Sequence, residues 1–414
     1  MFICYLRLFI SYNCLCNNIP IYTHTLISSE FCVKSFIMIK TNYKLYSDCV
    51  NFPLDRPCIY QKEKGAVCSS CKKYVSVNAK SKQIRILIVK LGAMGDVLRT
   101  TFILKGLKEK YKNSTIDWLV EKKNTDVLTG NKYIDTIIPN DSEVYKFLMT
   151  HKYDIVINLD LSLESLSFTN LVFANKKVGY YLDNSRKIVG SNSFAKKWLL
   201  TSAYDCLKKE NRQTYQYWMA NICELKKDDY EIVVPVSKQA KEKSKRFISS
   251  LKLNNSKIIG INPGAGKRWI MKKWRIEKYI KLIKTLSSKG YNILLLGGKD
   301  DEEEINLILK QKIKNVYSTG TDNSVQEFFA MADLCDLVVC GDTMAMHAAL
   351  GLKKNVVAVF GPTSYNEIEM YDRGIKIVSL ECNCCYRPDC NKKIKCMDKV
   401  SVENVLDAIQ TYIY

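Results

Sequence analysis

A strand, loop, helix, strand pattern in residues 336–362 constrains the fold of this chain more than any other feature. Residues 337–340 form a short apolar run, which is typical of a buried parallel strand. Asp342 and Thr343 follow where the N-cap and first turn of a helix are expected. A helix that begins there presents unpaired N–H groups and a partial positive charge, which favour a bound diphosphate. The alternative is that Asp342 only caps the helix and that His347 packs beneath it.

The same pattern occurs twice more along the chain. In residues 85–120 an apolar run is followed by a loop with Gly92 and Gly95, which permit a tight turn, then by a helical pattern and a second strand. A third unit spans residues 258–298. Repeated units of this kind predict two doubly wound α/β domains.

Several motifs occur in the order of one known family: LGAMGDVLRTT, NPGAGKRWIMKKWRIEKY, LLLGGKDDEEE, CGDTMAMHAAL and VAVFGPTS. From about residue 84 to the C-terminus the chain resembles glycosyltransferase family 9, which includes the ADP-heptose:lipopolysaccharide heptosyltransferases. Two positions depart from the family pattern. Met344 stands where a glycine usually follows the acidic residue and threonine, and Phe102 stands where a proline is often found.

The resemblance implies an α/β fold of GT-B architecture, in which two Rossmann-like doubly wound domains face a central cleft. It implies an inverting, metal-independent transfer of a heptose or related sugar from an ADP-activated donor. The implied acceptor is a lipopolysaccharide core or another cell-surface glycan, an anionic glycolipid at the inner membrane surface. We therefore expect a cytoplasmic enzyme, peripheral on the inner face of the membrane, that needs no cofactor for catalysis.

The resemblance also assigns site residues. Asp96 matches the general base, although a helix-capping role would suit the same carboxylate. Lys272 is expected to face the donor phosphates; its alternative, shared with Lys273, is a solvated surface lysine. The remaining expected donor residues are Asp301, Asp342, Thr343, Met344 and His347, and the expected loop residues are Gly92 and Gly95.

The charge composition of the chain indicates which kinds of partner it can bind. The 414 residues include 63 Lys and Arg against 42 Asp and Glu, a net charge of +21. This excess favours contact with anionic surfaces, namely nucleic acid, acidic lipid headgroups or phosphorylated glycolipids. Because the lysines are scattered, a gene composition that favours lysine codons is an equal alternative. No apolar run reaches the length of a membrane span, so we expect no transmembrane segment.

Seventeen cysteines include two clusters that suggest metal binding. Reduced thiols at two-residue spacing can share one ion, and zinc suits such ligands better than an iron–sulfur cluster does. Free cytosolic thiols are the alternative. The two candidate ligand sets are Cys49, Cys58, Cys68 and Cys71, and Cys382, Cys385, Cys390 and Cys396.

The chain divides into five segments by composition and pattern. Residues 1–37 lack a persistent pattern and are predicted to be a mis-called upstream extension, with Met38 as the natural start. We predict a Cys-rich appendage at 38–83, an acceptor domain at 84–228, a donor domain at 229–380 and a Cys-rich segment with a terminal helix at 381–414. The start of the second domain is predicted to be a strand containing Pro235 followed by a helix. The family fold implies that the terminal helix returns to the first domain.

Two other classes of function fit parts of the sequence. A dinucleotide-dependent oxidoreductase would use Glu121, which closes a strand where an acidic residue grips a ribose, but the loop GAMGD lacks the GxGxxG spacing. A non-catalytic, metal-dependent nucleic-acid-binding protein would explain the charge and the cysteines. It would not explain repeated nucleotide-type α/β units, and no aromatic-basic recognition motif accompanies them, so we expect no nucleic-acid partner.

Overall fold

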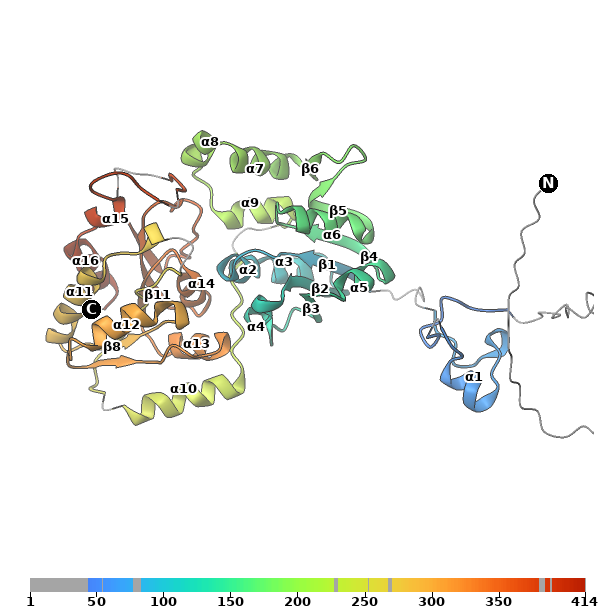
Figure 1. Ribbon diagram of the computed structural model, residues 1–414, viewed down its shortest axis with the longest axis horizontal. Coiled ribbons are helices and arrows are strands. Elements are labelled where there is room, and N and C mark those ends of the chain that lie inside the picture. Colours follow the sequence, from blue (N-terminus) through green and yellow to red (C-terminus); the bar gives the residue numbers. More distant parts are fainter. Residues whose placement is uncertain are drawn as a thin grey trace, which may run out of the picture. The chain divides into compact units, whose positions relative to one another are not determined.

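The structure is a computed structural model that describes residues 44–53, 55–76, 83–226, 230–251, 253–266, 270–379, 384–387 and 389–413. The chain divides into two compact units, Met1–Ser81 and Lys82–Tyr414, and both α/β domains lie in the second unit (Figure 1). The predicted extension at residues 1–37 lies outside the described residues. No described helix is both long and apolar enough to cross a membrane.

In the described residues of the small unit, the structure has one helix, one turn of 3-10 helix and a single antiparallel bridge. These are α1 (Ile59–Lys64), η1 (Cys68–Ser70) and the bridge between Cys49 and Ser76. The rings of Tyr46 and Tyr74 pack with their centroids 4.7 Å apart.

The first α/β domain is centred on a six-stranded sheet of order β3-β2-β1-β4-β5-β6, in which only β6 is antiparallel to its neighbour. Its strands are β1 (Ile84–Val89), β2 (Ser114–Glu121), β3 (Thr136–Asn140), β4 (Lys152–Asn158), β5 (Phe173–Leu182) and β6 (Ile188–Gly190). Its helices are α2 (Met94–Thr100), α3 (Ile103–Lys110), η2 (Lys122–Asn124), α4 (Thr125–Leu128), α5 (Val144–Thr150), α6 (Leu163–Leu171), α7 (Ser193–Ala203), α8 (Asp205–Glu210) and α9 (Tyr215–Ile222).

The second α/β domain has a wholly parallel sheet of order β12-β11-β10-β7-β8-β9. Its strands are β7 (Ile258–Ile261), β8 (Asn292–Leu295), β9 (Val316–Ser318), β10 (Leu337–Gly341), β11 (Asn355–Phe360) and β12 (Gly374–Val378). Its helices are α10 (Lys238–Ser250), η3 (Ile270–Lys272), α11 (Ile276–Ser288), η4 (Lys299–Asp301), α12 (Glu302–Leu309), α13 (Val325–Ala332), α14 (Met344–Gly351), α15 (Cys396–Lys399) and α16 (Val402–Ile413). Two doubly wound sheets confirm the predicted fold class.

Alternate residues of each central strand enter different cores, as the two-residue period of a strand requires. In β1, Ile86 and Ile88 face α2, α3 and α9, whereas Leu87 and Val89 face α5 and α6. The core containing Ile86 continues into the second domain through α13 and α14. The α/β domains therefore share buried apolar surface.

The predicted strand around Pro235 is wrong. Residues 230–237 have no strand pairing in the structure and instead cross between the domains. Val233 exchanges hydrogen bonds with the Thr101 hydroxyl, donating at 2.9 Å and accepting at 3.2 Å, and Pro235 has no N–H with which to join a ladder. The predicted helix after this segment is confirmed as α10.

The terminal helix also differs in position from the family-based expectation. Its predicted cap is confirmed, because the Ser401 hydroxyl accepts a hydrogen bond from the Asn404 N–H at 3.0 Å. However, Val405 and Ile409 pack in the core formed by α11 and the second sheet, so α16 stays with the second domain. An amphipathic helix buries its apolar face against the nearest uncovered sheet, and here that sheet is the second one.

Each sheet has one point at which the strand order reverses, and ligands in open α/β folds bind beside it at the carboxyl ends of the strands. In the first sheet this point lies between β1 and β4, and in the second between β7 and β10. The loops that leave these four strands carry Gly92, Asp160, Asn262 and Asp342. The topology thus predicts that a ligand binds at these loops.

Gly179 in β5 provides a test of the sheet beside the first reversal. Its φ is +84°, and a Cβ there would lie 1.9 Å from the carbonyl oxygen of Asn158. We predict that Gly179→Ala lowers the free energy of unfolding by at least about 3 kcal/mol, because strain and collision act together. Gly290→Ala is the control, since φ is +89° but nothing lies within 4 Å. It should cost about 1 kcal/mol in urea unfolding, and equal losses would contradict the argument.

Candidate active site

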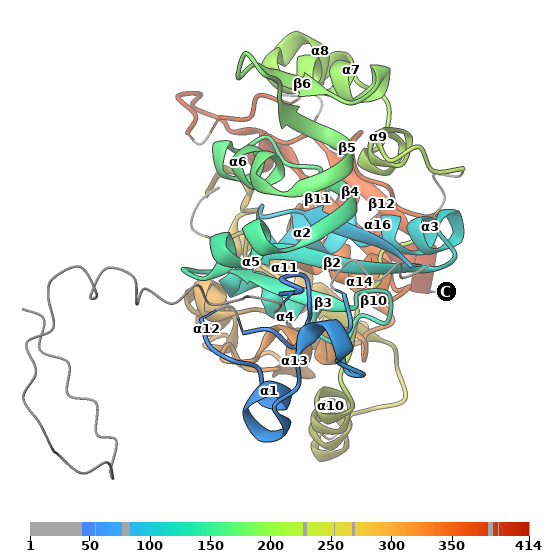
Figure 2. The same cartoon turned by 90° about the vertical axis from the view of Figure 1, so that its right-hand side faces the viewer.

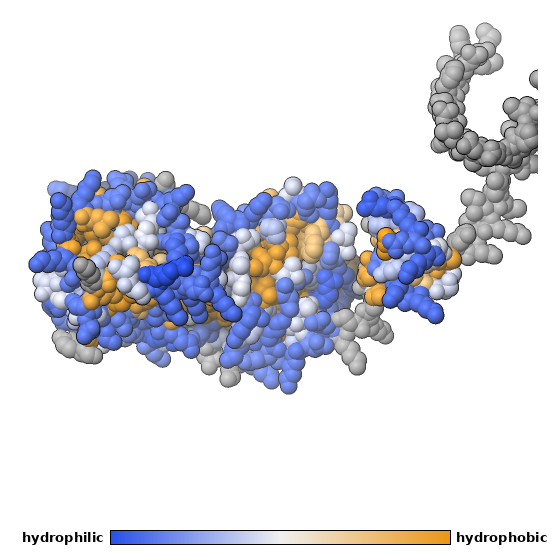
Figure 3. All heavy atoms as spheres, turned by 90° about the horizontal axis from the view of Figure 1, so that it is seen from below, coloured by the Kyte–Doolittle hydropathy of each residue, from blue (hydrophilic) through white to orange (hydrophobic). Residues whose placement is uncertain are grey.

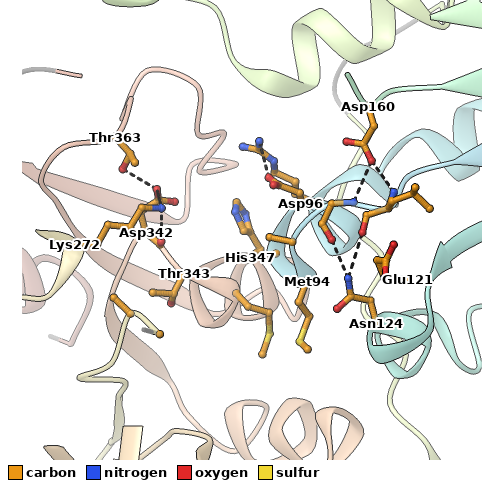
Figure 4. Close-up of a pocket in the computed structure, with 18 of the residues that line it drawn as sticks. Met94, Asp96, Glu121, Asn124, Asp160, Lys272, Asp342, Thr343, His347 and Thr363 are labelled. Atoms are coloured by element: carbon orange, nitrogen blue, oxygen red, sulfur yellow. Dashed lines mark hydrogen bonds and ion pairs between the residues drawn. The ribbon is translucent and has the colours of Figure 1, made fainter. Parts of the chain in front are cut away.

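One large cavity, of about 1030 Å³, is lined from both α/β domains. Its first side comes from the carboxyl edge of the β1–β4 sheet, and its second side from the loops after β10 and β11 (Figure 4). The described lining residues with polar side chains on the first side are Asp96, Arg99, Glu121, Lys123, Asn124, Asp160, Ser162 and Glu164. Those on the second side are Lys272, Asp300, Asp342, Thr343, His347, Thr363, Ser364, Glu367 and Tyr386.

A buried ion pair fixes the loop between β1 and α2. Lys90 is 5% exposed, and its Nζ lies 2.5 Å from Oδ1 of Asp160. Oδ2 of Asp160 accepts hydrogen bonds from the backbone N–H groups of Leu91 at 2.6 Å and Gly92 at 3.0 Å. Burial alone would lower the pKa of Lys90, but the charge of Asp160 raises it, so the lysine remains charged. Asn124 donates to the Gly92 carbonyl at 2.8 Å and holds the loop from its other side.

Asp96 lies in the first turn of α2 and faces the cavity. Its carboxylate pairs with Arg99 at 2.8 Å, and the Arg99 guanidinium stacks over the Tyr215 ring at 3.9 Å. Burial would raise the pKa of Asp96, but the charges of Arg99 and Lys90 outweigh it and hold the pKa below its ordinary value. The helix begins at Met94 with Ala93 as N-cap, so the alternative reading of Asp96 as the capping residue is wrong.

The two sides approach closely at Gly95. A Cβ there would lie 3.3 Å from Cδ2 of His347 and 3.5 Å from the Met344 Cα, so α2 and α14 can meet only if this position carries little bulk. Neither Gly95 nor Gly92 has a positive φ. Neither therefore supplies a left-handed conformation for the tight turn that the sequence suggested. Gly95 allows the close approach of α14, whereas a Cβ at Gly92 would make ordinary contacts at 3.5 Å. Burial lowers the pKa of His347 to about 4, so the imidazole is neutral at neutral pH.

A second buried ion pair lies at the start of α14. Lys272 Nζ is 2.8 Å from Oδ2 of Asp342, and the Thr363 hydroxyl donates to the same oxygen at 2.7 Å. Burial opposes ionisation of Asp342, but the charge and hydrogen bond of Lys272 lower its pKa to about 2. Thr343 is the N-cap of α14, and its hydroxyl donates to Asn262 at 3.3 Å instead of capping the helix. No side chain that the structure describes caps α14, although the Met346 N–H donates to the Thr343 carbonyl at 3.1 Å.

Asp301 lies apart from this group. It lines a neighbouring cavity of about 410 Å³ that shares Met344 and Thr343 with the large one. Its carboxylate accepts a hydrogen bond from the Gly298 N–H at 3.1 Å, and a Cβ at Gly264 would collide with it at 1.6 Å. Burial raises the pKa of Asp301. The two cavities together form an elongated site along the second domain.

The structure brings most of the predicted residues together. Asp96, Lys272, Asp342, Thr343, Met344, His347, Gly92 and Gly95 all line the large cavity. Lys273 points elsewhere and pairs with Glu304, so the alternative reading of a structural surface lysine suits Lys273 and not Lys272.

Sequence reasoning missed several lining or supporting residues. Asp160 could have been found from the sequence, because it is a polar residue that closely follows a buried strand. Arg99 could have been found because it lies one helical turn after Asp96. Glu367 and Tyr386 come from irregular segments without a local signal. In the structure the Tyr386 hydroxyl accepts from the Ser364 N–H at 3.2 Å and lies 3.4 Å from the Glu367 carboxylate. Burial raises the pKa of Glu367.

The first cysteine set does not form the predicted metal site. All four thiols line one cavity of about 110 Å³ in the small unit, together with Tyr60 and Tyr74. However, no group of three or more His, Cys, Asp or Glu among the described residues is placed to hold a metal ion. The residues concerned are Cys49, Cys58, Cys68 and Cys71.

The structure describes only part of the second cysteine set. Cys382 lies outside the described residues, so its metal site stays a prediction. Cys385, Cys390 and Cys396 are partly exposed and form no disulfide.

The depressed pKa of His347 leads to a prediction about stability. Between about pH 6.5 and about pH 4 the unfolded chain binds a proton at this imidazole that the folded chain does not bind. The free energy of unfolding should therefore fall by about 3 kcal/mol as the pH is lowered through this window. His347→Gln should lack this component, so urea unfolding at several pH values should give a shallower dependence for the variant. Identical dependences would show that His347 is not buried in its neutral form.

Known proteins with similar sequences and structures agree on one family. The family model described as "Glycosyltransferase family 9 (heptosyltransferase)" matches residues 143–398. The chain is 25% identical to lipooligosaccharide heptosyltransferase 2 of Campylobacter jejuni over 338 residues, covering 77% of this chain and 95% of that protein.

Solved structures show the same fold. A family 9 glycosyltransferase from Veillonella parvula superposes with a TM-score of 0.65 at 19% identity, covering 80% of this chain and 97% of that one. The Escherichia coli ADP-heptose LPS heptosyltransferase II superposes with a TM-score of 0.59 at 17% identity, covering 80% and 98%. These superpositions support the GT-B architecture of the two parallel-sheet α/β domains in this chain. The family match spans most of the chain, and the site lies at the facing edges of the two sheets; the protein therefore belongs to glycosyltransferase family 9 and is a glycosyltransferase.

Proposed function

We propose that this glycosyltransferase moves a heptose or related sugar from an ADP-activated donor to a lipopolysaccharide core or another cell-surface glycan. The names of its relatives support heptose transfer in lipopolysaccharide synthesis. Within the site, the observation that carries the proposal is the placement of Asp96 opposite Lys272 and the start of α14 across one cavity. Membership in a glycosyltransferase family sets aside the oxidoreductase and the nucleic-acid-binding alternatives.

The donor is assigned to the second side. A diphosphate at the start of α14 would meet a helix N-terminus that no described side chain caps, and with it the positive end of the helix. Lys272 adds a cation there, and the ionised Asp342 orients its ammonium through the 2.8 Å contact. Asp342 thus acts through Lys272, since a carboxylate would repel a diphosphate directly. The neighbouring cavity with Asp301 is assigned to the nucleoside, whose ribose hydroxyls suit a carboxylate acceptor.

The acceptor is assigned to the first side. Glu121 and Glu164 both line the cavity there, and the Asn140 amide donates to each of them, at 2.8 and 2.9 Å. Carboxylates accept hydrogen bonds from sugar hydroxyls. A sugar ring on this side would place a hydroxyl between Asp96 and the donor.

The proposed reaction is a single displacement with inversion. The acceptor hydroxyl oxygen bonds to the anomeric carbon while the bond from that carbon to the diphosphate oxygen breaks. Asp96 takes the hydroxyl proton, and the leaving ADP carries the negative charge that α14 and Lys272 stabilise. This displacement, as proposed, uses no metal ion. Because Arg99 and Lys90 keep Asp96 ionised, the base is ready at neutral pH.

Asp96→Asn tests the base. Asparagine preserves the size of the side chain but cannot take a proton, so we predict turnover reduced at least about a hundredfold, with ADP binding and folding retained. Turnover would be measured with ADP-heptose and truncated lipopolysaccharide, by mass spectrometry of the product. Asp126→Asn is the matched control, because Asp126 lies in the first turn of α4 and lines none of the cavities described here. Wild-type turnover in Asp96→Asn would remove the general-base role.

Two neighbouring lysines allow a test of the donor site. Loss of the charge-assisted contact in Lys272→Ala should weaken ADP binding about ten- to a hundredfold, measured by calorimetry. Asp342→Ala should weaken it as well, since Lys272 loses its partner. Lys273→Ala removes the same charge one residue away, where the lysine pairs with Glu304, and should leave affinity nearly unchanged. Equal ADP affinities in Lys272→Ala and the wild type would mean that the donor phosphates bind elsewhere.

A further inference from the structure

A basic projection lies beside the cavity in the first domain. We define the basic cap as residues 184–209, which comprise the turn before β6, β6 itself, α7 and most of α8. It contains six Lys and Arg residues and one Asp, compared with 63 and 42 in the whole chain. Asp183 and Glu210 flank the cap, and residues 183–210 together carry six cations against three acids, a net excess per residue about twice that of the whole chain.

The outer face of α7 combines these cations with apolar side chains. Lys196, Lys197, Leu200, Ala203 and Tyr204 follow helical spacing and are all exposed. Leu200 is 51% exposed and Tyr204 is 56% exposed. A face of this kind, with lysines beside leucine and tyrosine, is typical of a surface that lies on a lipid bilayer.

The turn before β6 extends this face. Arg186, Lys187 and Ile188 are exposed at its tip. The Asp183 carboxylate accepts from the N–H groups of Ser185 at 2.8 Å and Lys187 at 2.9 Å, so the turn is held in one conformation. The contact between α7 and β6 places these residues next to the helix.

The cations of the cap lack internal counter-charges. Within the part of the chain that the structure describes, no carboxylate forms an ion pair with Lys187, Lys196 or Lys197. Lys208 has a distant partner in Asp205, at 4.0 Å. The positive field of the cap is thus free to act on an external anionic surface.

The cap is rigidly supported from beneath. The Trp198 ring of α7 packs against Trp218 and Tyr215 of α9, with centroids 5.6 and 6.3 Å apart. The Phe194 ring packs on Trp218 at 6.4 Å. Aromatic packing of this extent holds α7 against the domain, so that its outer face does not fold inward.

The cap lies at the rim of the active-site cavity. Lys208 lies over the Tyr386 ring at 4.9 Å, and Tyr386 lines the cavity. Figures 1 and 2 both show α7 and α8 at the opposite end of the α/β unit from α10. A surface that rested on the cap would therefore lie near the entrance through which an acceptor must arrive.

We propose that the basic cap docks this enzyme on an anionic phospholipid bilayer. The proposal rests on the proposed function, since a lipid-linked acceptor would be presented at that surface. Lysine and arginine attract acidic headgroups, whereas tyrosine and leucine enter the interface between headgroups and acyl chains. Nucleic acid would use the cations but has no need of exposed Leu200 and Ile188.

The test measures co-sedimentation of the full-length protein with vesicles that contain no sugar acceptor. Binding to mixed phosphatidylglycerol and phosphatidylcholine vesicles is expected for the wild type, decreasing with salt and absent with phosphatidylcholine alone. Lys196→Glu with Lys197→Glu should reduce binding roughly tenfold or more. Leu200→Ser with Tyr204→Ser should reduce binding with little change in its salt dependence.

Helix α10 provides the matched control. Lys241 and Lys245 are exposed there, and the same charge reversals, Lys241→Glu with Lys245→Glu, change the net charge of the protein equally. Figure 3, viewed from the α10 side, shows hydrophilic surface along this helix. Equal losses in the two double variants would mean that net charge alone is responsible and would overturn the proposal. Stronger binding to an oligonucleotide than to the vesicles would also overturn it.

Failure of this proposal can be told apart from failure of the proposed function. The vesicle assay contains neither donor nor acceptor, so it reports docking whether or not heptose is transferred. Conversely, the cap variants should keep wild-type turnover on an acceptor fragment without acyl chains, because none of the changed residues lines the cavity. Vesicle binding retained in both cap variants would remove the cap as the docking surface.

Discussion

The site depends on the ion pair between Lys90 and Asp160, buried under the loop that follows β1. One carboxylate neutralises the lysine and also accepts the N–H groups of Leu91 and Gly92, which would otherwise have no partner at the end of a central strand. Removing either charge would leave the other buried alone, at a cost of several kcal/mol. The loop is thereby fixed, and with it the start of α2 and the direction of Asp96.

A second consequence of the fixed loop is the contact between the domains. Because Gly95 follows the pinned segment, its bare backbone meets His347 and the start of α14. The imidazole there is neutral, so it adds no charge between Asp96 and Asp342, and the charge of Asp342 raises the pKa of Asp96. Each carboxylate is instead held ionised by its own cation, Arg99 on one side and Lys272 on the other. Paired charges of this kind let two acids share one cavity.

The charge of the protein is unevenly distributed over its surfaces. The first side of the cavity, which we propose binds the acceptor, carries Glu121 and Glu164, although the chain as a whole is strongly basic. Lys187, Lys196 and Lys197 on the basic cap form no ion pair with a carboxylate that the structure describes. Separation of this kind suits an enzyme that reads neutral hydroxyls inside its cavity and meets an anionic surface outside it.

The sequence by itself determined the two doubly wound sheets, because continuous apolar runs followed by glycine or acidic loops have few other folds open to them. The family resemblance of its motifs singled out Asp96, Lys272 and Asp342, and all three line one cavity in the structure. Only the tertiary structure decided the partners of these residues. Asp160 reaches Leu91 across 69 positions of chain, and Glu367 comes from an irregular segment of the other domain. The local sequence pattern does not predict such pairings, because they depend on how the strands are ordered and how the domains meet.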